Sequence, residues 1–483
     1  MQRLLTVSRI MGYFSLMFSV SMVVPILVSL AYDDGEARSF FYSLLIALFI
    51  GGVLTLAGQR GQRDLATRDG FLVVGLFWFV MGLLAAMPLR FVLDLSLVDA
   101  LFESVSALTT TGATILVGLD DMAPSLLLYR QLLQWLGGMG MIVLAVAVMP
   151  LIGVGGMNIY RAEAPGPMKD EKLTPRLATT ARLLWSIYIG LTLLNALAYW
   201  AAGMTPFDAV AHALSTVSTG GFSTHDDSLG YFHSTAIEAV AVFFMLMGAI
   251  NFSVHFLVLR HRNPLIWFQD TEVRTFLFFV LTVVVLVSAI LRSSGEYHSM
   301  PPSVRNAVFE VVSVVTSTGF GTVDFSHWPD FLPILLIFIS FVGGCGGSTA
   351  GGMKVMRVIV MFRQGLREIR RLIHPRAVIP LRVGGQRIDD RTVDAVWGFM
   401  AAYVGSFVVL MLLMIHSGGL DALSAFSAVA TCMNNLGPGL GAVASNFTEV
   451  TDAGKLISVF AMLLGRLEVF TLLVLLTPEF WKR

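Results

Sequence analysis

Charged side chains are scarce in this chain. Only 13% of its 483 residues are Asp, Glu, Lys or Arg, whereas a soluble domain carries about 25%. Apolar residues make up 56% of the chain, and they come in blocks of about twenty, the length of helix that crosses a bilayer. This composition excludes a soluble globular protein, and we predict an all-α integral membrane protein.

Cysteine is scarce as well, and catalytic motifs are missing. The two cysteines, Cys345 and Cys432, lie in apolar surroundings far apart in the sequence, so no structural disulfide is indicated. The sequence has no Walker loop, metal-ligand cluster or nucleophile–base pattern. We therefore predict that the chain is not an enzyme, binds no cofactor and has no nucleic-acid partner. No small-residue cleavage site follows the apolar stretch 16–30, so no cleavable signal is expected.

The apolar blocks predict ten transmembrane helices. Their bounds lie near 10–31, 40–58, 70–89, 125–153, 182–202, 233–259, 273–292, 331–362, 393–416 and 452–477. Twenty-five of the 32 Lys and Arg residues fall in the even-numbered connections and the two termini, so the positive-inside rule places both termini in the cytoplasm. The opposite side has nineteen acidic and six basic residues, and such a negative mouth concentrates cations.

One unit recurs along the chain. Residues 100–112 and 307–319 share eight identities in thirteen positions, where average composition gives about one. Similar turns lie within the other long odd-numbered connections. The four turns read "TTTGAT" (109–114), "VSTGGF" (217–222), "TSTGFG" (316–321) and "NNLGPG" (434–439). We predict four pseudo-symmetric repeats, each a helix, a re-entrant pore half-helix, a Gly turn and a second helix.

The repeats set the predicted domain organisation. Two extra helices occupy 1–60, and the repeats occupy 70–155, 180–262, 272–375 and 392–483. We take Gly112, Gly220, Gly319 and Gly437 as the central glycines, each followed after 24 to 28 residues by a second glycine: Gly137, Gly248, Gly343 and Gly465.

The four turns predict an ion pore. A single Ser-Thr-Gly turn most often only ends a helix, but four in the same order favour one shared role. Irregular backbone at membrane depth must line a water-filled path, and its carbonyl oxygens can replace the water shell of an ion. The Thr hydroxyl before the glycine can add a ligand oxygen, and the negative ends of the half-helices favour a cation.

The turns resemble those of the Trk/Ktr/HKT superfamily of potassium transporters, and so do "LGGMGMIVL", "GGCGGSTAGGMK" and "GRLEVFTLLVLLTPEFW". The first two helices and "YRAEAPGP" (160–167) resemble the bacterial TrkH/TrkG branch. The resemblance implies a K⁺-conducting pore of four non-identical repeats in the bacterial inner membrane. It also implies a homodimer with one pore per protomer and a cytosolic nucleotide-binding regulatory ring of the TrkA kind.

The resemblance also implies a K⁺-binding selectivity filter. Its residues are Thr110, Thr111, Gly112, Thr219, Gly220, Gly221, Thr318, Gly319, Asn435, Leu436 and Gly437. The fourth repeat departs from the Ser/Thr-Thr-Gly pattern, so any side-chain oxygen there comes from Asn434 or Asn435. We therefore expect weaker Na⁺ rejection than in a fourfold-symmetric channel. Sodium-preferring members of the superfamily have serine at the first glycine, which is Gly112 here.

A glycine run interrupts the eighth span. Six of the ten residues 343–352 are glycine, and each costs about 1 kcal/mol in a helix interior. We predict an unwound loop beneath the filter that can block or open the cavity; close helix packing is the alternative. Arg466 lies near mid-membrane, where charge is costly. We expect it to bind carbonyls of this loop or to face the cavity, with a structural ion pair as the alternative.

The predicted gating residues are therefore Gly343, Gly344, Gly346, Gly347, Ser348, Thr349, Gly351, Gly352 and Arg466. Glu103 and Glu310, nine residues before Gly112 and Gly319, favour a structural role in the half-helices. The segment 354–391 has ten Lys and Arg against three acids. Contact with anionic membrane lipid and docking of an acidic cytosolic partner remain equally open.

Three function classes fit these features. The first is a gated K⁺-selective channel, the second a K⁺/H⁺ or K⁺/Na⁺ coupled symporter, and the third the membrane subunit of a pump with a separate ATP-driven motor. Carriers tend to place ionisable residues along the path. The predicted filter has none, which favours the channel.

Overall fold

The described part of the chain is almost wholly helical. The computed structural model describes residues 2–59, 67–143, 177–329 and 331–482. Within them the only strands are a short antiparallel pair, β1 (Arg382–Val383) and β2 (Gln386–Arg387). The all-α class is confirmed for these residues. The end of the fourth predicted span, 144–153, and the stretch 160–167 lie outside them.

Six straight spans of the described part are long and apolar enough to cross a membrane. They are α1 with α2 (Gln2–Ser21, Val23–Tyr32), α3 (Ala37–Ala57), α4 (Thr67–Leu93), α9 (Leu177–Ala201), α14 (Thr271–Ser293) and α18 (Asp390–Ser417). Large apolar side chains such as Phe49 and Phe278 are about 70% exposed on them, as a lipid-facing surface requires. A multi-pass membrane protein is therefore confirmed.

Three predicted spans are broken in the structure. The sixth is α11 (Thr235–Ala249) and α12 (Phe252–His261), bent by 98°, and the tenth is α20 (Asp452–Arg466) and α21 (Phe470–Leu476), bent by 119°. The eighth is α16 (Leu332–Ser340) and α17 (Val355–Ile373), with no helix across 341–354. The prediction of single helices at 233–259 and 452–477 is wrong, because the chain turns after Ala249 and Arg466. Counting each bent pair as one span gives up to eight, and the predicted number of ten stays a prediction.

Four shorter helices, which we call the pore helices, lie between the spans. They are α5 (Leu97–Leu108), α10 (Pro206–Val217), α15 (Met300–Val315) and α19 (Ala422–Asn434). Three begin at a side chain that accepts a backbone N–H of the first turn: Ser96, Thr205 and Asp421. Such caps supply partners to the otherwise unpaired first N–H groups. At 12 to 16 residues, the pore helices are too short to cross a bilayer.

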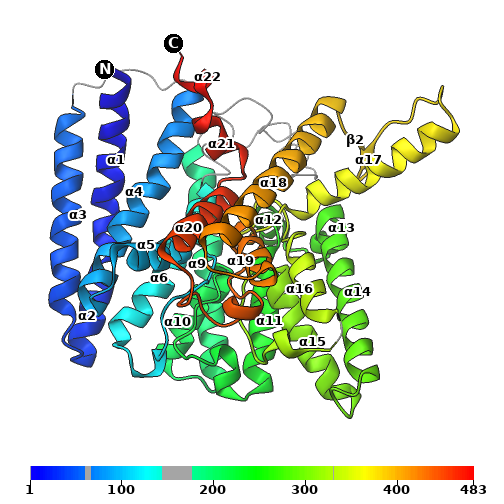
Figure 1. The fold of residues 1–483 in the computed structure, drawn as a ribbon. Helices are drawn as coiled ribbons and strands as arrows, with labels where there is room; N and C mark the ends of the chain where they lie inside the picture. The colour runs from blue at the N-terminus through cyan, green and yellow to red at the C-terminus, as the bar shows by residue number, and fades with distance from the viewer. Residues whose placement is uncertain (1, 60–66, 144–176, 330, 483) are drawn as a thin grey trace.

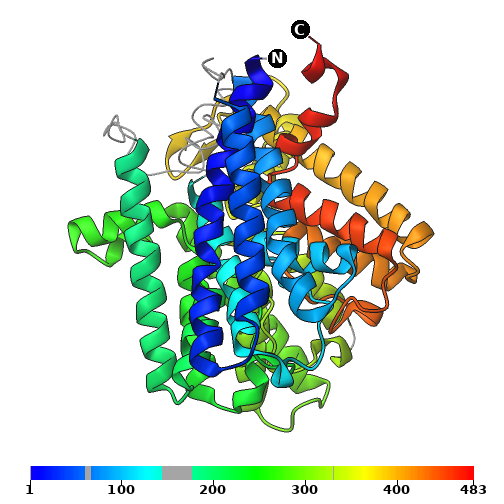
Figure 2. The ribbon, with the colours of Figure 1, turned by 90° about the vertical axis from the view of Figure 1, so that its left-hand side faces the viewer.

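The helices that follow the pore helices close a ring. Each packs on the pore helix of the next unit: α6 (Pro124–Val143) on α10, α11 on α15, α16 on α19, and α20 on α5. The contact of α20 with α5 joins the fourth repeat to the first. Around this ring, α1 and α3 pack side by side at one edge of the molecule (Figures 1 and 2). The start of α1 and α22 (Pro478–Trp481) lie at the same end (Figure 1).

The remaining described elements are short. They are α13 (Leu265–Gln269), η1 (Leu119–Asp121), η4 (Ser228–Phe232), η5 (Phe325–His327) and η6 (Gly441–Val443). The four η turns lie in the segments that lead away from the pore helices.

Glycines let the C-terminal ends of the pore helices pack closely on the helices that follow them. A β-carbon on Gly137 or Gly465 would lie about 2 Å from the carbonyl oxygen of Leu108 or Met433, respectively. Gly248 lies less closely against the end of α10, where the same β-carbon would be 3.0 Å from the Val217 carbonyl oxygen. In the third repeat the predicted second glycine, Gly343, instead packs on the unwound loop itself.

Candidate functional site: a ring of four turns

The four turns after the pore helices share one unusual backbone conformation. The first residue has φ between 52° and 54°, and the residue two positions later is a glycine with φ between 80° and 100°. The first residues are Thr110, Thr219, Ser317 and Asn435, and the glycines are Gly112, Gly221, Gly319 and Gly437. Left-handed backbone is costly for residues with a side chain, and for a β-branched Thr above all. Its fourfold recurrence indicates one shared role.

The backbone angles correct the register predicted for the second turn. Gly221, and not Gly220, has the positive φ of the central glycines. Gly220 corresponds to Thr111, since the N–H of each bonds back to the carbonyl five residues earlier, at Ser215 and Ser106. The prediction of Gly220 as a central glycine is wrong, because two adjacent glycines leave the register open in the sequence.

The turns meet around one axis. A β-carbon added to each central glycine would lie within 2.7 Å of a carbonyl oxygen of the next repeat. The four pairs are Gly112 with Gly220 (2.4 Å), Gly221 with Thr318 (1.9 Å), Gly319 with Leu436 (2.0 Å) and Gly437 with Thr111 (2.7 Å). The last pair closes the ring from the fourth repeat to the first. All eleven predicted filter residues therefore lie in the four segments of this ring.

The hydroxyl groups of the ring differ in whether they have a hydrogen-bond partner. The hydroxyls of Thr111 and Thr318 lie 2.8 and 2.7 Å from those of Thr109 and Thr316, at the ends of their own pore helices. Thr110 has a buried hydroxyl with no hydrogen-bond partner among the described residues.

In the fourth turn the structure distinguishes between Asn434 and Asn435, the two residues predicted to supply a side-chain oxygen. The Asn434 amide donates to Ser340 and its oxygen accepts from Tyr403, so it is engaged by α16 and α18. Asn435 donates across the repeat boundary to the Thr111 hydroxyl at 3.0 Å. Of the two asparagines, only Asn435 therefore remains as a side chain of the ring.

Outside the ring lies a small polar cavity of about 100 Å³. All four central glycines line it, together with His225 and Asp226. Each repeat therefore contributes to the wall of this cavity, which we call the outer cavity.

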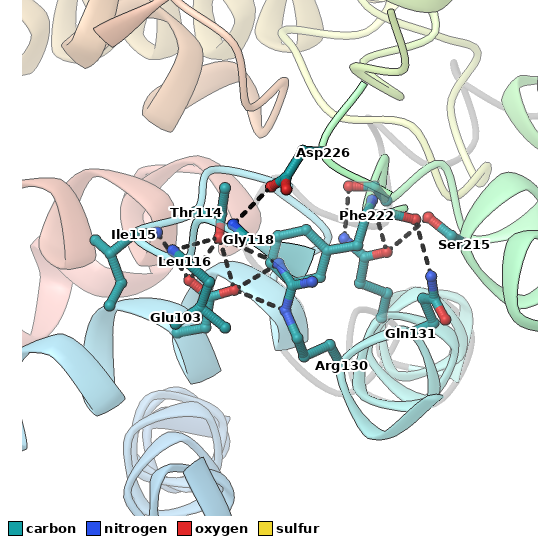
Figure 3. A network of polar contacts seen from close by, with 12 residues as sticks. Glu103, Thr114, Ile115, Leu116, Gly118, Arg130, Gln131, Ser215, Phe222 and Asp226 are labelled. Carbon is teal, nitrogen blue, oxygen red and sulfur yellow. Dashed lines mark hydrogen bonds and ion pairs between the residues drawn. The ribbon is translucent and has the colours of Figure 1, made fainter. Parts of the chain in front are cut away.

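A buried ion pair lies beside this cavity, which Arg130 helps to line. Arg130 on α6 lies 2.8 Å from Glu103 on α5, and both side chains are almost fully buried. Glu103 also accepts from the Thr114 hydroxyl and the Ile115 N–H, and the Arg130 guanidinium stacks over Phe222 of the second turn at 4.1 Å (Figure 3). Arg130 thus links the first turn to the second.

Glu310 holds the third turn in a similar way. Its carboxylate accepts from the N–H groups of Thr322 and Val323, which follow the turn. Both glutamates thus accept hydrogen bonds from residues just after their own turns, and the structural role predicted for them stays a prediction.

The glycine run between α16 and α17 lies against the inner side of the ring. Gly351 donates its N–H to the Ser317 hydroxyl at 2.5 Å, and Gly352 donates to the Asn434 carbonyl at 3.1 Å. The Thr349 hydroxyl donates to the carbonyls of Val217 and Gly248. Residues 341–354, which we call the inner loop, therefore touch the turns of the second, third and fourth repeats.

Arg466 ties this loop to the first repeat. Its guanidinium donates to the carbonyl oxygens of Thr349 and Gly137, each at 3.0 Å. The side chain is 2% exposed, and Glu468 pairs with Arg357 instead. The expected loop-carbonyl partner is therefore present. Only about 10 Å³ of space remains among Gly351, Asn435 and Arg466, about enough for one water molecule.

Two residues of the ring region were missed in the sequence. Ser317 corresponds to Thr110, and pairing "TTTG" with "TSTG" would have identified it. Gln134 lies on α6, far from any turn, and its Nε2 donates to the Gly220 carbonyl at 2.6 Å. No local signal in the sequence points to that contact. Among the described residues, no group of three or more His, Cys, Asp or Glu side chains could hold a metal ion.

His225 joins the outer loops of the first two repeats. Its ring contacts Asp120 of η1, lies 3.6 Å from Asp208 of α10, and stacks on Tyr231. Burial opposes its protonation, but the hydrogen bonds and charges of Asp208 and Asp120 outweigh burial and raise its pKa above the ordinary 6.5. A raised folded-state pKa stabilises the protein below pH 6.5, and this stabilisation is lost as the pH rises through the folded-state pKa.

We therefore expect His225→Gln to lower the thermal unfolding temperature more at about pH 5 than at about pH 9. Unfolding curves of the purified protein in detergent would measure the difference. His327→Gln is the matched control, because His327 also pairs with an aspartate but is 84% exposed. Equal losses at both pH values for His225→Gln would contradict the ion-pair assignment.

The chain is similar to known proteins over its whole length. A model of the TrkH family, described as "Cation transport protein", matches residues 36–483. "Trk system potassium uptake protein TrkH" of Vibrio parahaemolyticus is 50% identical over 481 residues, with 99% of each chain covered. The protein of that name from Escherichia coli is 48% identical over 478 residues, again with 99% of each chain covered. The crystal structure of the potassium transporter TrkH from Vibrio parahaemolyticus superposes with a TM-score of 0.92 at 48% identity, covering 99% of both chains.

Proposed function

Because the chain belongs to the TrkH family of cation transport proteins, we propose that it takes up potassium as a gated, K⁺-selective channel. It is a potassium transport protein and not an enzyme, and K⁺ is the transported ion. Membership of the family does not by itself define the channel mechanism, the filter, the gate or the partners, and these are what we propose.

The ring of four turns carries this proposal. Each central glycine lies against a carbonyl oxygen of the next repeat, so the oxygens gather at one level around the axis. Such an arrangement suits a cation that loses its water shell. The acids of the first and third pore helices, Glu103 and Glu310, both accept hydrogen bonds from residues just after their own turns, which favours a structural role over the carrying of a coupled proton.

In this proposal each part of the molecule has a role. The four repeats, 70–155, 180–262, 272–375 and 392–483, surround one pore, and 1–60 add two helices outside it. The eleven filter residues, joined by Ser317, bind K⁺. Residues 343–352 of the inner loop are the gate, and Arg466 holds them in the blocking arrangement. The protein is a homodimer in the bacterial inner membrane with both termini in the cytoplasm.

Single-channel recording tests the mechanism. Purified protein in planar bilayers is expected to show resolved unitary currents that reverse near the K⁺ equilibrium potential in mixed K⁺/Na⁺ solutions. The alternative, a K⁺/H⁺ or K⁺/Na⁺ symporter, moves ions in fixed stoichiometry and gives no unitary currents. A reversal potential that follows the proton or sodium gradient would favour the symporter and refute the channel.

The segment 354–391 is the proposed contact for a cytosolic nucleotide-binding ring of the TrkA kind. α17 projects from the body of the molecule (Figure 1), and its last turn carries Arg370 and Arg371. The Arg371 side chain is 41% exposed and pairs with Glu368 on its own helix. Arg367, in contrast, is almost buried and bonds to Asp390 at the start of α18, so it serves the fold of the segment.

We expect Arg370→Glu with Arg371→Glu to weaken co-purification of the ring by about tenfold or more, since exposed charges steer and orient partners. Pull-down of the ring with purified protein would measure this. Arg260→Glu on α12 is the control for a basic residue on another helix. Undiminished binding of the ring by the double variant would leave contact with anionic lipid as the role of this segment.

A further inference from the structure

One repeat of the ring lacks a side chain that its neighbours have. Thr111, Thr318 and Leu436 occupy three equivalent positions, and Gly220 occupies the fourth. The space is not empty: a β-carbon on Gly220 would lie 2.4 Å from Cδ and 2.5 Å from Oε1 of Gln134. Gln134 comes from α6 of the preceding repeat and is fully buried. Its amide therefore occupies the place of the missing side chain.

The Gln134 amide forms hydrogen bonds through both its nitrogen and its oxygen. Its Nε2 donates to the Gly220 carbonyl at 2.6 Å, and its Oε1 accepts from the Ser215 hydroxyl at 2.7 Å and from the Phe222 N–H at 3.2 Å. These contacts reach the end of α10, the ring, and the residue just outside the ring. A buried amide with all these partners present holds one orientation, because losing any bond leaves a buried polar group unpaired.

Two of the other repeats hold this position with a hydroxyl of their own. In the first and third, the Thr before the central glycine pairs with the Thr at the helix end, Thr109 with Thr111 and Thr316 with Thr318. The second repeat has Ser218 at the helix-end position, and its hydroxyl bonds back into α10. In the first and third repeats the position is thus held by a hydroxyl of the same repeat, whereas in the second its place is taken by a side chain of the preceding repeat.

We propose that Gln134 is a positioning residue of the filter that sets K⁺ over Na⁺ selectivity by fixing the Gly220 carbonyl. The inference rests on the proposed channel function. The Gly220 oxygen is the one that lies against Gly112, so it belongs to the ring itself. A carbonyl that also accepts from Gln134 cannot close inward onto a smaller ion without breaking this bond, which disfavours Na⁺.

Gln134→Met tests the bond, because methionine keeps the length of the side chain but cannot donate. Loss of a hydrogen bond to a buried carbonyl changes an equilibrium by about tenfold, so we expect the Na⁺-to-K⁺ permeability ratio to rise by about that factor. Reversal potentials in mixed K⁺/Na⁺ solutions measure it. Gln131→Met is the matched control: Gln131 is equally buried one turn away, and its amide is 3.4 Å from the Phe222 carbonyl. We expect its ratio to stay within about twofold of wild type.

A compensating pair of substitutions tests whether Gln134 takes the place of the missing side chain. Gly220→Thr alone should disrupt the ring, because the new side chain overlaps Gln134. Adding Gln134→Ala removes the overlap and leaves the new hydroxyl next to Ser218, as in the first and third repeats. We expect the double variant to recover folding and K⁺ selectivity that Gly220→Thr loses, a strong positive coupling in the double-mutant cycle.

Three results would overturn the inference. One is a wild-type permeability ratio in Gln134→Met; another is a double variant no better folded or no more selective than Gly220→Thr alone. In both cases normal K⁺-selective currents of the wild-type protein leave the proposed function standing. A wild-type protein without K⁺-selective current would overturn both proposals.

Discussion

Gly319→Ala is expected to raise the relative Na⁺ permeability by about tenfold or more. The new methyl group would lie 2.0 Å from the Leu436 carbonyl and 2.8 Å from the Pro438 ring. Because both neighbours are backbone or backbone-constrained, the turns of the third and fourth repeats must move apart. Overpacking of this kind costs ~1–3 kcal/mol, and 1.4 kcal/mol is a factor of ten in an equilibrium.

The control for Gly319→Ala separates crowding from backbone strain. Gly295 has φ of +84°, close to the +81° of Gly319, but a β-carbon there meets nothing within 4 Å. Gly295→Ala therefore adds the left-handed strain alone, outside the ring. We expect reversal potentials of Gly295→Ala to match the wild type. If Gly319→Ala also keeps the wild-type ratio, the four turns do not form the filter.

Arg466→Met is expected to raise K⁺ flux in the absence of any cytosolic partner. The substitution keeps most of the side-chain volume and removes two charge-assisted hydrogen bonds, to Thr349 and Gly137. Such bonds are worth ~1.5–3 kcal/mol each, so their loss shifts the inner loop away from the blocking arrangement by about tenfold or more. It also removes a positive charge from beneath the ring. Tracer K⁺ uptake into vesicles containing purified protein would measure the gain.

Two further variants make the Arg466 test specific. Deleting Gly346–Ala350 removes the Thr349 carbonyl itself and should act in the same direction. Lys455→Met removes a positive charge from the same helix, α20, where Lys455 pairs with Asp99 at the far end from Arg466. We expect it to leave flux unchanged. If the folded Arg466→Met and deletion variants show no gain, the inner loop is packing and the gate lies elsewhere.

The features predictable from the sequence were those that depend on neighbouring residues. Apolar blocks of about twenty residues predict spans because a lipid-facing helix must be apolar along its own length. The run of glycines at 343–352 predicts the interruption between α16 and α17, because each glycine weakens the helix where it stands. The glycines of the turns were visible for the same reason, because a left-handed backbone is a local demand that glycine meets without steric cost.

The features that the sequence left open depend on contacts between distant segments. Gly220 and Gly221 are both glycine, so only the backbone angles in the assembled ring decide which is central. The bends after Ala249 and Arg466 carry no Pro or Gly run, and they follow from the packing of α12 and α21. A charge near mid-membrane predicted a partner for Arg466, but that the partners are Thr349 and Gly137 depends on two other repeats.

The groups of the ring can also be divided into those that the sequence predicts and those that only the tertiary structure brings together. The sequence by itself determined that this is a helical membrane protein with four copies of one turn, because composition and repetition are properties of the chain alone. The tertiary structure decided which groups face one another there: Gln134 at Gly220, Ser317 under Gly351, and Asn435 at Thr111. Two of these pairs, Gln134 with Gly220 and Asn435 with Thr111, join different repeats, and Ser317 and Gly351 are 34 positions apart within the third. Only the folding of the four repeats into a closed ring brings such distant groups within hydrogen-bond distance.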